Sequence, residues 1–531
     1  MKEYDFEKVP IVEIANEILL DGVKKGASDI HFDPSKENLT VRMRIDGILY
    51  DYSIVPPNFK RNMISRLKMI AGMNIMETRL PQDGAIKSKI GDKVLDLRVS
   101  SLPTNVGEKV VLRILDYSKS LQGLETLGFS EMNLNKILKM VEIPNGIVLV
   151  TGATGSGKST TVYSILQKLN TRDVNIITVE DPVEMDVEGI NQVQAQQEIG
   201  LDFANVLRSI LRQDPDVIMI GEIRDGETAS IAVRASITGH KVLSTIHTNN
   251  ALNTIERLTD MGVERYLIGT SLNGVISQKL ARKLCPYCRQ ARETSDYEKG
   301  LFKEILNLNI NRVFDVNHDG CEHCFKGYIG RIAIAEVLLI DDFIKEAITA
   351  AADKKKMRKL VYGTGNTHTL LQDGLEKVAL GETSFDEILK LVDLENDLET
   401  HRALNADLEN DKKNGKKVEI PKLEIPQEIQ LALASAIIAP KMEQEAQKEG
   451  RPVKKEYIPS QQAANPPRNP ETTTQVTSLP PRNAEPSKSI SALPPRKGPA
   501  TPAPKETPAP TPEVVKPTPE EKTVTEEFLE L

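Results

Sequence analysis

The feature that most constrains the fold of this chain is a glycine-rich turn between an apolar run and a helical pattern. The turn reads Gly152-Ala153-Thr154-Gly155-Ser156-Gly157-Lys158-Ser159-Thr160, which fits G-x-x-x-x-G-K-[ST]. It follows a strand-like run over residues 146–151 and opens a helical pattern over residues 157–169. Glycines let the backbone amides of such a turn approach phosphate oxygens closely. The sequence therefore predicts that this turn binds ATP, with Lys158 at the β and γ phosphates and Ser159 on Mg²⁺.

The same pattern of strand, loop and helix recurs further along the chain. Residues 176–179 and 216–220 are short apolar runs of the strand type, each separated from the next by helical or loop segments. This alternation is typical of a parallel α/β sheet. We therefore expect an α/β ATPase domain over residues 119–340.

Three further regions flank this predicted domain. Residues 1–118 alternate a helical pattern (9–25) with strand-like runs such as 38–45 and 94–99, which predicts an α+β domain. Residues 341–395 are amphipathic and helix-rich. Residues 396–531 form a linker and a tail in which 21 of the 31 prolines follow Glu419.

The composition of the tail predicts disorder beyond Pro452, because few aromatic residues and many prolines cannot bury enough surface to offset the entropy of ordering. Pro-Pro-Arg occurs three times with a spacing of 14 residues, ending at Arg468, Arg482 and Arg496. Low-complexity duplication is the interpretation we favour, and a multivalent docking tail that binds a partner is the alternative.

Charge and hydropathy exclude several classes of protein. The formal net charge is -8, the sequence pI is about 5.7 and tryptophan is absent, so we expect no sequence-specific nucleic acid as a partner. No run approaches the roughly 18 consecutive apolar residues of a membrane-spanning helix, and the first ten residues do not resemble a signal peptide. We expect a cytoplasmic protein.

An acidic residue follows the third strand-like run. Glu222 comes two residues after the apolar segment that ends at Ile220, and ligands of α/β sheets bind at the carboxyl ends of strands. Glu222 is therefore the candidate that orients or deprotonates the attacking water near the γ-phosphate.

The segment that contains Glu222, LRQDPDVIMIGEIRD at residues 211–225, resembles the signature of the type II secretion and type IV pilus assembly ATPases. ITVEDPVE at residues 177–184 is similar to the aspartate box of that family, and residues 239–250 are similar to its histidine box. The resemblance implies a RecA-like core. It also implies that Glu180, Asp181 and Glu184 surround the metal and the water, and that His247 senses the phosphate.

The N-terminal region also resembles the family, through ASDIHF at 27–32, RMRIDG at 42–47, RLPQDG at 79–84 and GEKVVLR at 107–113. In the family this domain swings over bound ATP, which makes Arg79, Arg98 and Arg113 candidate charge clamps on the γ-phosphate. Two residues depart from the pattern: Ala85 and Lys109 each stand where the family usually has arginine.

All four cysteines occur in two C-x-x-C pairs, Cys285 with Cys288 and Cys321 with Cys324. A tetrahedral, structural Zn²⁺ site fits two such pairs, whereas two disulfides are unexpected in a cytoplasmic enzyme and a redox C-x-x-C needs no duplicate. His323 lies within the second pair, and we expect it to be a bystander because four sulfurs already complete the site. The expected zinc knuckle covers residues 285–324.

The resemblance covers roughly residues 11–391 and implies a motor that hydrolyses ATP. The expected protein is a homohexamer, peripheral at the cytoplasmic face of the inner membrane, that works on a platform protein of a secretion or pilus machine. Retraction ATPases of pili typically lack the tetracysteine segment, so assembly or secretion is favoured. Two alternatives stay open, a DNA-uptake or conjugation ATPase and a nucleotide-gated scaffold. Longer members carry an extra N-terminal docking domain, so the C-terminal tail is a candidate substitute.

Overall fold

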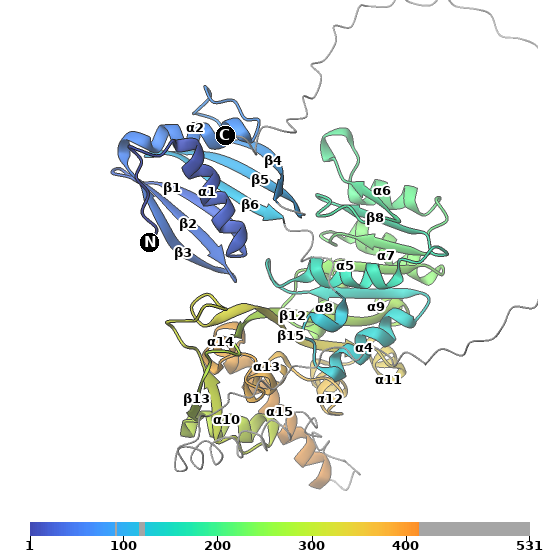
Figure 1. Ribbon diagram of the computed structural model, residues 1–531. Coiled ribbons are helices and arrows are strands. Elements are labelled where there is room, and N and C mark those ends of the chain that lie inside the picture. Colours follow the sequence, from blue (N-terminus) through green and yellow to red (C-terminus); the bar gives the residue numbers. More distant parts are fainter. Residues whose placement is uncertain (91–92, 116–122, 414–531) are drawn as a thin grey trace, which may run out of the picture. The chain divides into compact units, whose positions relative to one another are not determined.

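The computed structural model describes residues 1–90, 93–115 and 123–413, which are coloured in Figure 1. The Pro-Pro-Arg repeats and the rest of the predicted tail lie outside the described residues.

The N-terminal part is an antiparallel sheet with two helices. The strand order is β3-β2-β1-β6-β5-β4, and α1 and α2 share one apolar core with the sheet (Figure 1). Every second residue of β2, from Leu39 to Ile45, is buried, as expected for a strand with one covered face. The elements are α1 (Ile11–Lys24), β1 (Ala27–Pro34), β2 (Leu39–Ile45), β3 (Ile48–Val55), α2 (Lys60–Ile70), β4 (Gln82–Ile90), β5 (Lys93–Thr104) and β6 (Gly107–Leu115).

The central part is a seven-stranded sheet in the order β15-β12-β7-β11-β10-β8-β9. Its strands are parallel to their neighbours except for the pair β12 and β15, which is antiparallel. All residues of β7, β8, β10 and β11 are buried, as parallel strands covered on both faces require. The strands are β7 (Gly146–Thr151), β8 (Ile176–Glu180), β9 (Ile190–Gln194), β10 (Val217–Ile220), β11 (Lys241–Ile246), β12 (Leu272–Leu284) and β15 (Tyr328–Leu339).

Helices pack against this sheet in two separate cores. One core joins the sheet to α4 (Glu131–Glu142) and α5 (Lys158–Leu169). The other joins it to six helices: α6 (Phe203–Ile210), α7 (Gly226–Ile237), α8 (Ala251–Asp260), α9 (Arg265–Ser271), α11 (Asp342–Thr349) and α12 (Lys354–Tyr362). The α/β fold predicted from the alternating pattern is therefore confirmed.

A fourth core lies where β12 and β15 extend beyond the central sheet. It contains apolar residues of α10 (Asp296–Leu306), α13 (Leu370–Ala379) and α14 (Phe385–Leu391), beside the small ladder of β13 (Gln290–Glu293) and β14 (Arg312–Asp315). A further helix, α15 (Leu394–Lys413), occupies residues where a linker was expected to begin. Among the described helices, none combines the length and the apolar character of a membrane span.

Candidate active site

The glycine-rich turn joins β7 to α5 as its sequence predicts. Gly152 and Gly157 have φ angles of +147° and +88°, which side-chain-bearing residues rarely adopt. A Cβ at Gly152 would lie 2.4 Å from the carbonyl oxygen of Gln278, so the backbone needs glycine there. The Lys158 ammonium donates to the carbonyl oxygens of Gly152 at 2.9 Å and Ala153 at 3.2 Å. Burial lowers the pKa of Lys158, and the charge of Glu222 opposes that shift.

Gln278 of β12 holds the turn through two hydrogen bonds. Its side-chain amide donates to the carbonyl oxygen of Ser156 at 2.8 Å, and its oxygen accepts a 2.8 Å bond from the Thr161 hydroxyl of α5. The turn and the first turn of α5 are therefore held by one side chain. This fixed backbone suits a phosphate group, because its amides are oriented before the ligand arrives.

Acidic residues follow the neighbouring strands. Glu180 ends β8 and is 3% exposed, whereas Asp181 and Glu184 lie exposed in the loop that follows it. Glu222 comes just after β10, and β8 and β10 are paired in parallel, so these acids lie at the same edge of the sheet. The same edge carries the glycine-rich turn, which follows β7.

Glu222 has two partners of potential positive charge. Its carboxylate forms an ion pair with Arg224, and its Oε2 lies 3.6 Å from Nε2 of His247. The hydrogen bond to Glu222 raises the pKa of Arg224. Glu222 is thus close to the residue predicted to sense phosphate.

Most residues of the predicted site line one cleft of about 800 Å³. The residues of the predicted site that line it are Thr154, Gly155, Gly157, Lys158, Ser159, Thr160, Glu180, Asp181, Glu184, Glu222, His247 and Arg113. Gly152, Ala153 and Ser156 belong to the same turn without lining the cleft. Lysine, hydroxyl and carboxylate groups at one sheet edge fit a nucleotide and its Mg²⁺, with Lys158 and Ser159 as the residues that would hold them.

The three predicted arginine clamps differ in position. Arg113 lines the cleft and its Nε donates to Asp29 at 3.1 Å. Arg98 donates to the carbonyl oxygen of Val183, within the acidic loop, at 3.0 Å. Arg79 does not line the cleft, and its exposed guanidinium pairs with Glu77 at 3.0 Å. The roles of all three stay predictions.

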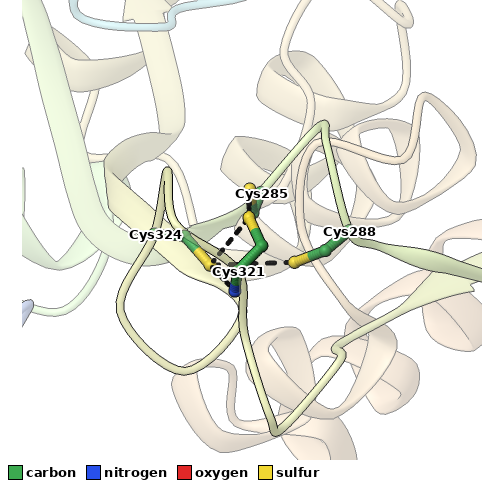
Figure 2. A group of neighbouring side chains, drawn as sticks. All are labelled: Cys285, Cys288, Cys321 and Cys324. Atoms are coloured by element: carbon green, nitrogen blue, oxygen red, sulfur yellow. Dashed lines mark hydrogen bonds between the residues drawn. The ribbon is translucent and has the colours of Figure 1, made fainter.

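The four cysteines converge at one point, as Figure 2 shows. Their sulfur atoms lie within 4.8 Å of one another, and the three pairs of closest sulfurs are each 3.7 Å apart. Tetrahedral zinc with Zn–S bonds of 2.3 Å places its sulfurs about 3.8 Å apart. All four thiols are free of disulfides. The cluster therefore fits Zn²⁺.

His323 lies beside this cluster without joining it. Its ring packs against Tyr287 with centroids 4.3 Å apart, and its Nε2 lies 3.4 Å from Glu322. The group able to hold a metal contains the four cysteines alone among the described residues.

Comparison with known proteins identifies the family of this chain. The family model described as type II/IV secretion system protein matches residues 5–390. The chain is 44% identical over 388 residues to the type II secretion system ATPase E of Vibrio cholerae, a match that covers 72% of this chain and 76% of that protein. It is 46% identical over 385 residues to the type IV pilus assembly ATPase PilB of Myxococcus xanthus, which covers 72% and 68%.

The chain belongs to the type II/IV secretion system protein family. The family that the aspartate and histidine boxes indicated is thereby confirmed, and so is the prediction of a P-loop ATPase. The ATPase DotB of Legionella pneumophila shares the fold, with a TM-score of 0.54, 22% identity and coverage of 74% of this chain and 98% of that one.

Sequence reasoning missed several residues of this family member's cleft. Arg44 of β2 and Arg331 of β15 line it, as does Tyr163 of α5. Arg44 lies within RMRIDG at 42–47, one of the segments that resemble the family, so a signal for it existed. Tyr163 carried no signal, because an aromatic residue in an amphipathic helix most often belongs to the core.

Proposed function

We propose that this protein is an ATP-hydrolysing motor that powers assembly of a type II secretion pseudopilus or a type IV pilus. The observation that carries the proposal is one cleft that gathers the glycine-rich turn, the acids at and just after the ends of β8 and β10, and His247. Similarity to ATPase E and to PilB supports the assembly direction. The tetracysteine cluster supports the same direction.

Each residue has a role that its position supports. Lys158 binds the β and γ phosphates and exchanges its bonds to Gly152 and Ala153 for phosphate oxygens. Ser159 would hold Mg²⁺, which supplies positive charge against the phosphates when bound. Glu222 orients or deprotonates the water, and the ion pair with Arg224 fixes its carboxylate.

Nucleotide turnover would drive motion through the N-terminal domain. Arg113 lines the cleft beside Asp29, and its charge would stabilise the γ-phosphate until hydrolysis removes that group. Loss of this interaction would release the N-terminal domain, so that lobe closure becomes work on an inner-membrane platform protein. A homohexameric ring at the cytoplasmic face of the membrane is the proposed assembly.

The test combines two variants with capture from membranes. Glu222→Gln keeps the shape of the side chain but removes the charge, so it should bind ATP, hydrolyse it slowly and retain membrane partners. Lys158→Ala should abolish turnover, since no other side chain of the turn carries a positive charge to the phosphates. Pilin-assembly partners in the Glu222→Gln capture would support a pilus motor, and secretin-linked partners would support export.

Two results would overturn parts of this proposal. Wild-type hydrolysis by Lys158→Ala would refute the assigned nucleotide site. Slow turnover that Glu222→Gln leaves unchanged, with normal pilus or pseudopilus assembly, would favour a nucleotide-gated scaffold. Truncation after Glu419 tests the tail separately, because full membrane association of the shortened chain would exclude the tail as a docking element.

A further inference from the structure

The buried carboxylate of Glu180 is held by three side-chain donors. Its Oε1 accepts a 2.6 Å bond from the Thr178 hydroxyl and a 3.1 Å bond from the Gln192 amide. Its Oε2 accepts a hydrogen bond from the Tyr163 hydroxyl. A carboxylate has about four lone-pair sites, so these bonds leave room for one further donor such as a water. Glu180 is 3% exposed, so the donors also replace the water that the buried group has lost.

The three donors come from three different elements, two strands and one helix. Thr178 shares β8 with Glu180, and Gln192 lies on the neighbouring β9. Gln192 is also bonded to the backbone of Met185 and Val187, so it shapes the loop as well. Tyr163 differs because it lies on α5, the helix that begins at Lys158.

The Tyr163 bond therefore connects the acid of β8 to the helix of the phosphate-binding turn. Tyr163 and Glu180 line the same cleft as Lys158 and Glu222. The phenol is 3% exposed, so its ring packs in the core while its hydroxyl reaches the carboxylate. Burial raises the pKa of Tyr163, and the bond to Glu180 raises it further, so the phenol stays neutral and remains a donor.

We infer that Tyr163 is a positioning residue for ATP hydrolysis, which fixes the Glu180 carboxylate relative to the phosphate-binding turn. This inference rests on the proposed function and adds a residue to it. Without the phenol hydroxyl, Oε2 loses its donor and the carboxylate can rotate within its site. Substrate binding depends on Lys158 and the backbone of the turn, so it should be retained. The chemical step, which needs the acid in one place, should slow.

The test is Tyr163→Phe in the full-length chain, which removes one oxygen and keeps the ring. We expect kcat for ATP hydrolysis to fall roughly tenfold, as loss of a hydrogen bond to a charged group predicts. Affinity for a fluorescent ATP analogue should stay within about twofold of wild type, since the binding groups are unchanged. Ser164→Ala is the matched control, because among the described residues its hydroxyl bonds the Thr160 carbonyl oxygen of the same helix and does not contact Glu180.

A double-mutant cycle separates positioning from packing. In a Glu180→Gln background the carboxylate is gone, so Tyr163→Phe should change kcat by less than about twofold. Thr178→Val removes a second donor from the same carboxylate and should lower kcat in the wild-type background as well. Each variant should bind nucleotide if it is folded, and binding of the fluorescent ATP analogue measures this directly.

The outcomes distinguish this inference from the proposed function. A wild-type chain without ATPase activity overturns both. The inference is tested separately if wild type is active and Lys158→Ala is inactive. In that case, a kcat equal to that of wild type in both Tyr163→Phe and Thr178→Val overturns the inference and leaves the proposed function intact. An undiminished effect of Tyr163→Phe in the Glu180→Gln background also overturns it, since the tyrosine would then act elsewhere.

Discussion

A buried acid in the ATPase domain should make the stability of this protein fall as pH rises. Glu336 of β15 is 3% exposed, and its Oε1 accepts bonds from the backbone amide of Ala251 at 2.8 Å and the Tyr362 hydroxyl at 3.0 Å. Burial raises the pKa of Glu336 from 4.5 to about 7, against the lowering effect of these two bonds. Ala251 begins α8, directly after the histidine box, so this acid supports a segment of the cleft.

The magnitude follows from the difference between the folded and unfolded pKa values. A rise from 4.5 to about 7 corresponds to roughly 3 kcal/mol between the two protonation states. Because the folded-state pKa is the higher one, this contribution is fully present below about pH 4.5 and is lost as pH rises through about 7. Roughly 2 kcal/mol of it should disappear between about pH 5.5 and pH 8.

Glu336→Gln isolates this contribution, because the amide oxygen can still accept both bonds but the side chain cannot ionise. Between about pH 5.5 and pH 8, we expect the unfolding free energy of wild type to fall by about 2 kcal/mol more than that of Glu336→Gln. Urea unfolding followed by circular dichroism at several pH values measures it. Glu346→Gln, at an exposed position of α11, is the control and should run parallel to wild type. Parallel curves for Glu336→Gln would refute the reasoning.

Two further predictions concern the zinc cluster and the glycine-rich turn. Wild type should carry one Zn²⁺ per chain in a chelator assay and Cys321→Ser should lose it, whereas His323→Gln should keep it because His323 lies outside the four-sulfur group. Zinc retained by Cys321→Ser, or lost by His323→Gln, would contradict this assignment. Gly155→Ala should cost about 1 kcal/mol of unfolding free energy through its left-handed backbone. Gly152→Ala should cost clearly more, since its Cβ would also lie 2.4 Å from Gln278, and equal costs in urea unfolding would exclude that clash.

The parts of this protein that sequence could predict are those whose signal is local. The strand at residues 146–151 and the helix of α5 lie next to the turn that defines them, and the structure places them at β7 and within one residue of the predicted start of α5. The two C-x-x-C pairs are 33 residues apart, yet thiol chemistry alone indicated that they meet. In each case the residue types carry the information.

The residues that could not be predicted from sequence are those whose partners depend on how helices pack against the sheet. Tyr163 bonds Glu180 because α5 packs on the sheet with that face inward, which a helical pattern of apolar residues does not distinguish from ordinary core packing. Glu336 lies in an apolar strand, and its partners Ala251 and Tyr362 come from helices distant in sequence. Both are polar groups buried within otherwise apolar elements, where a buried group must find a specific partner. Residues that support the chemistry of this protein are therefore best sought among the polar residues that lie within apolar strands and helices.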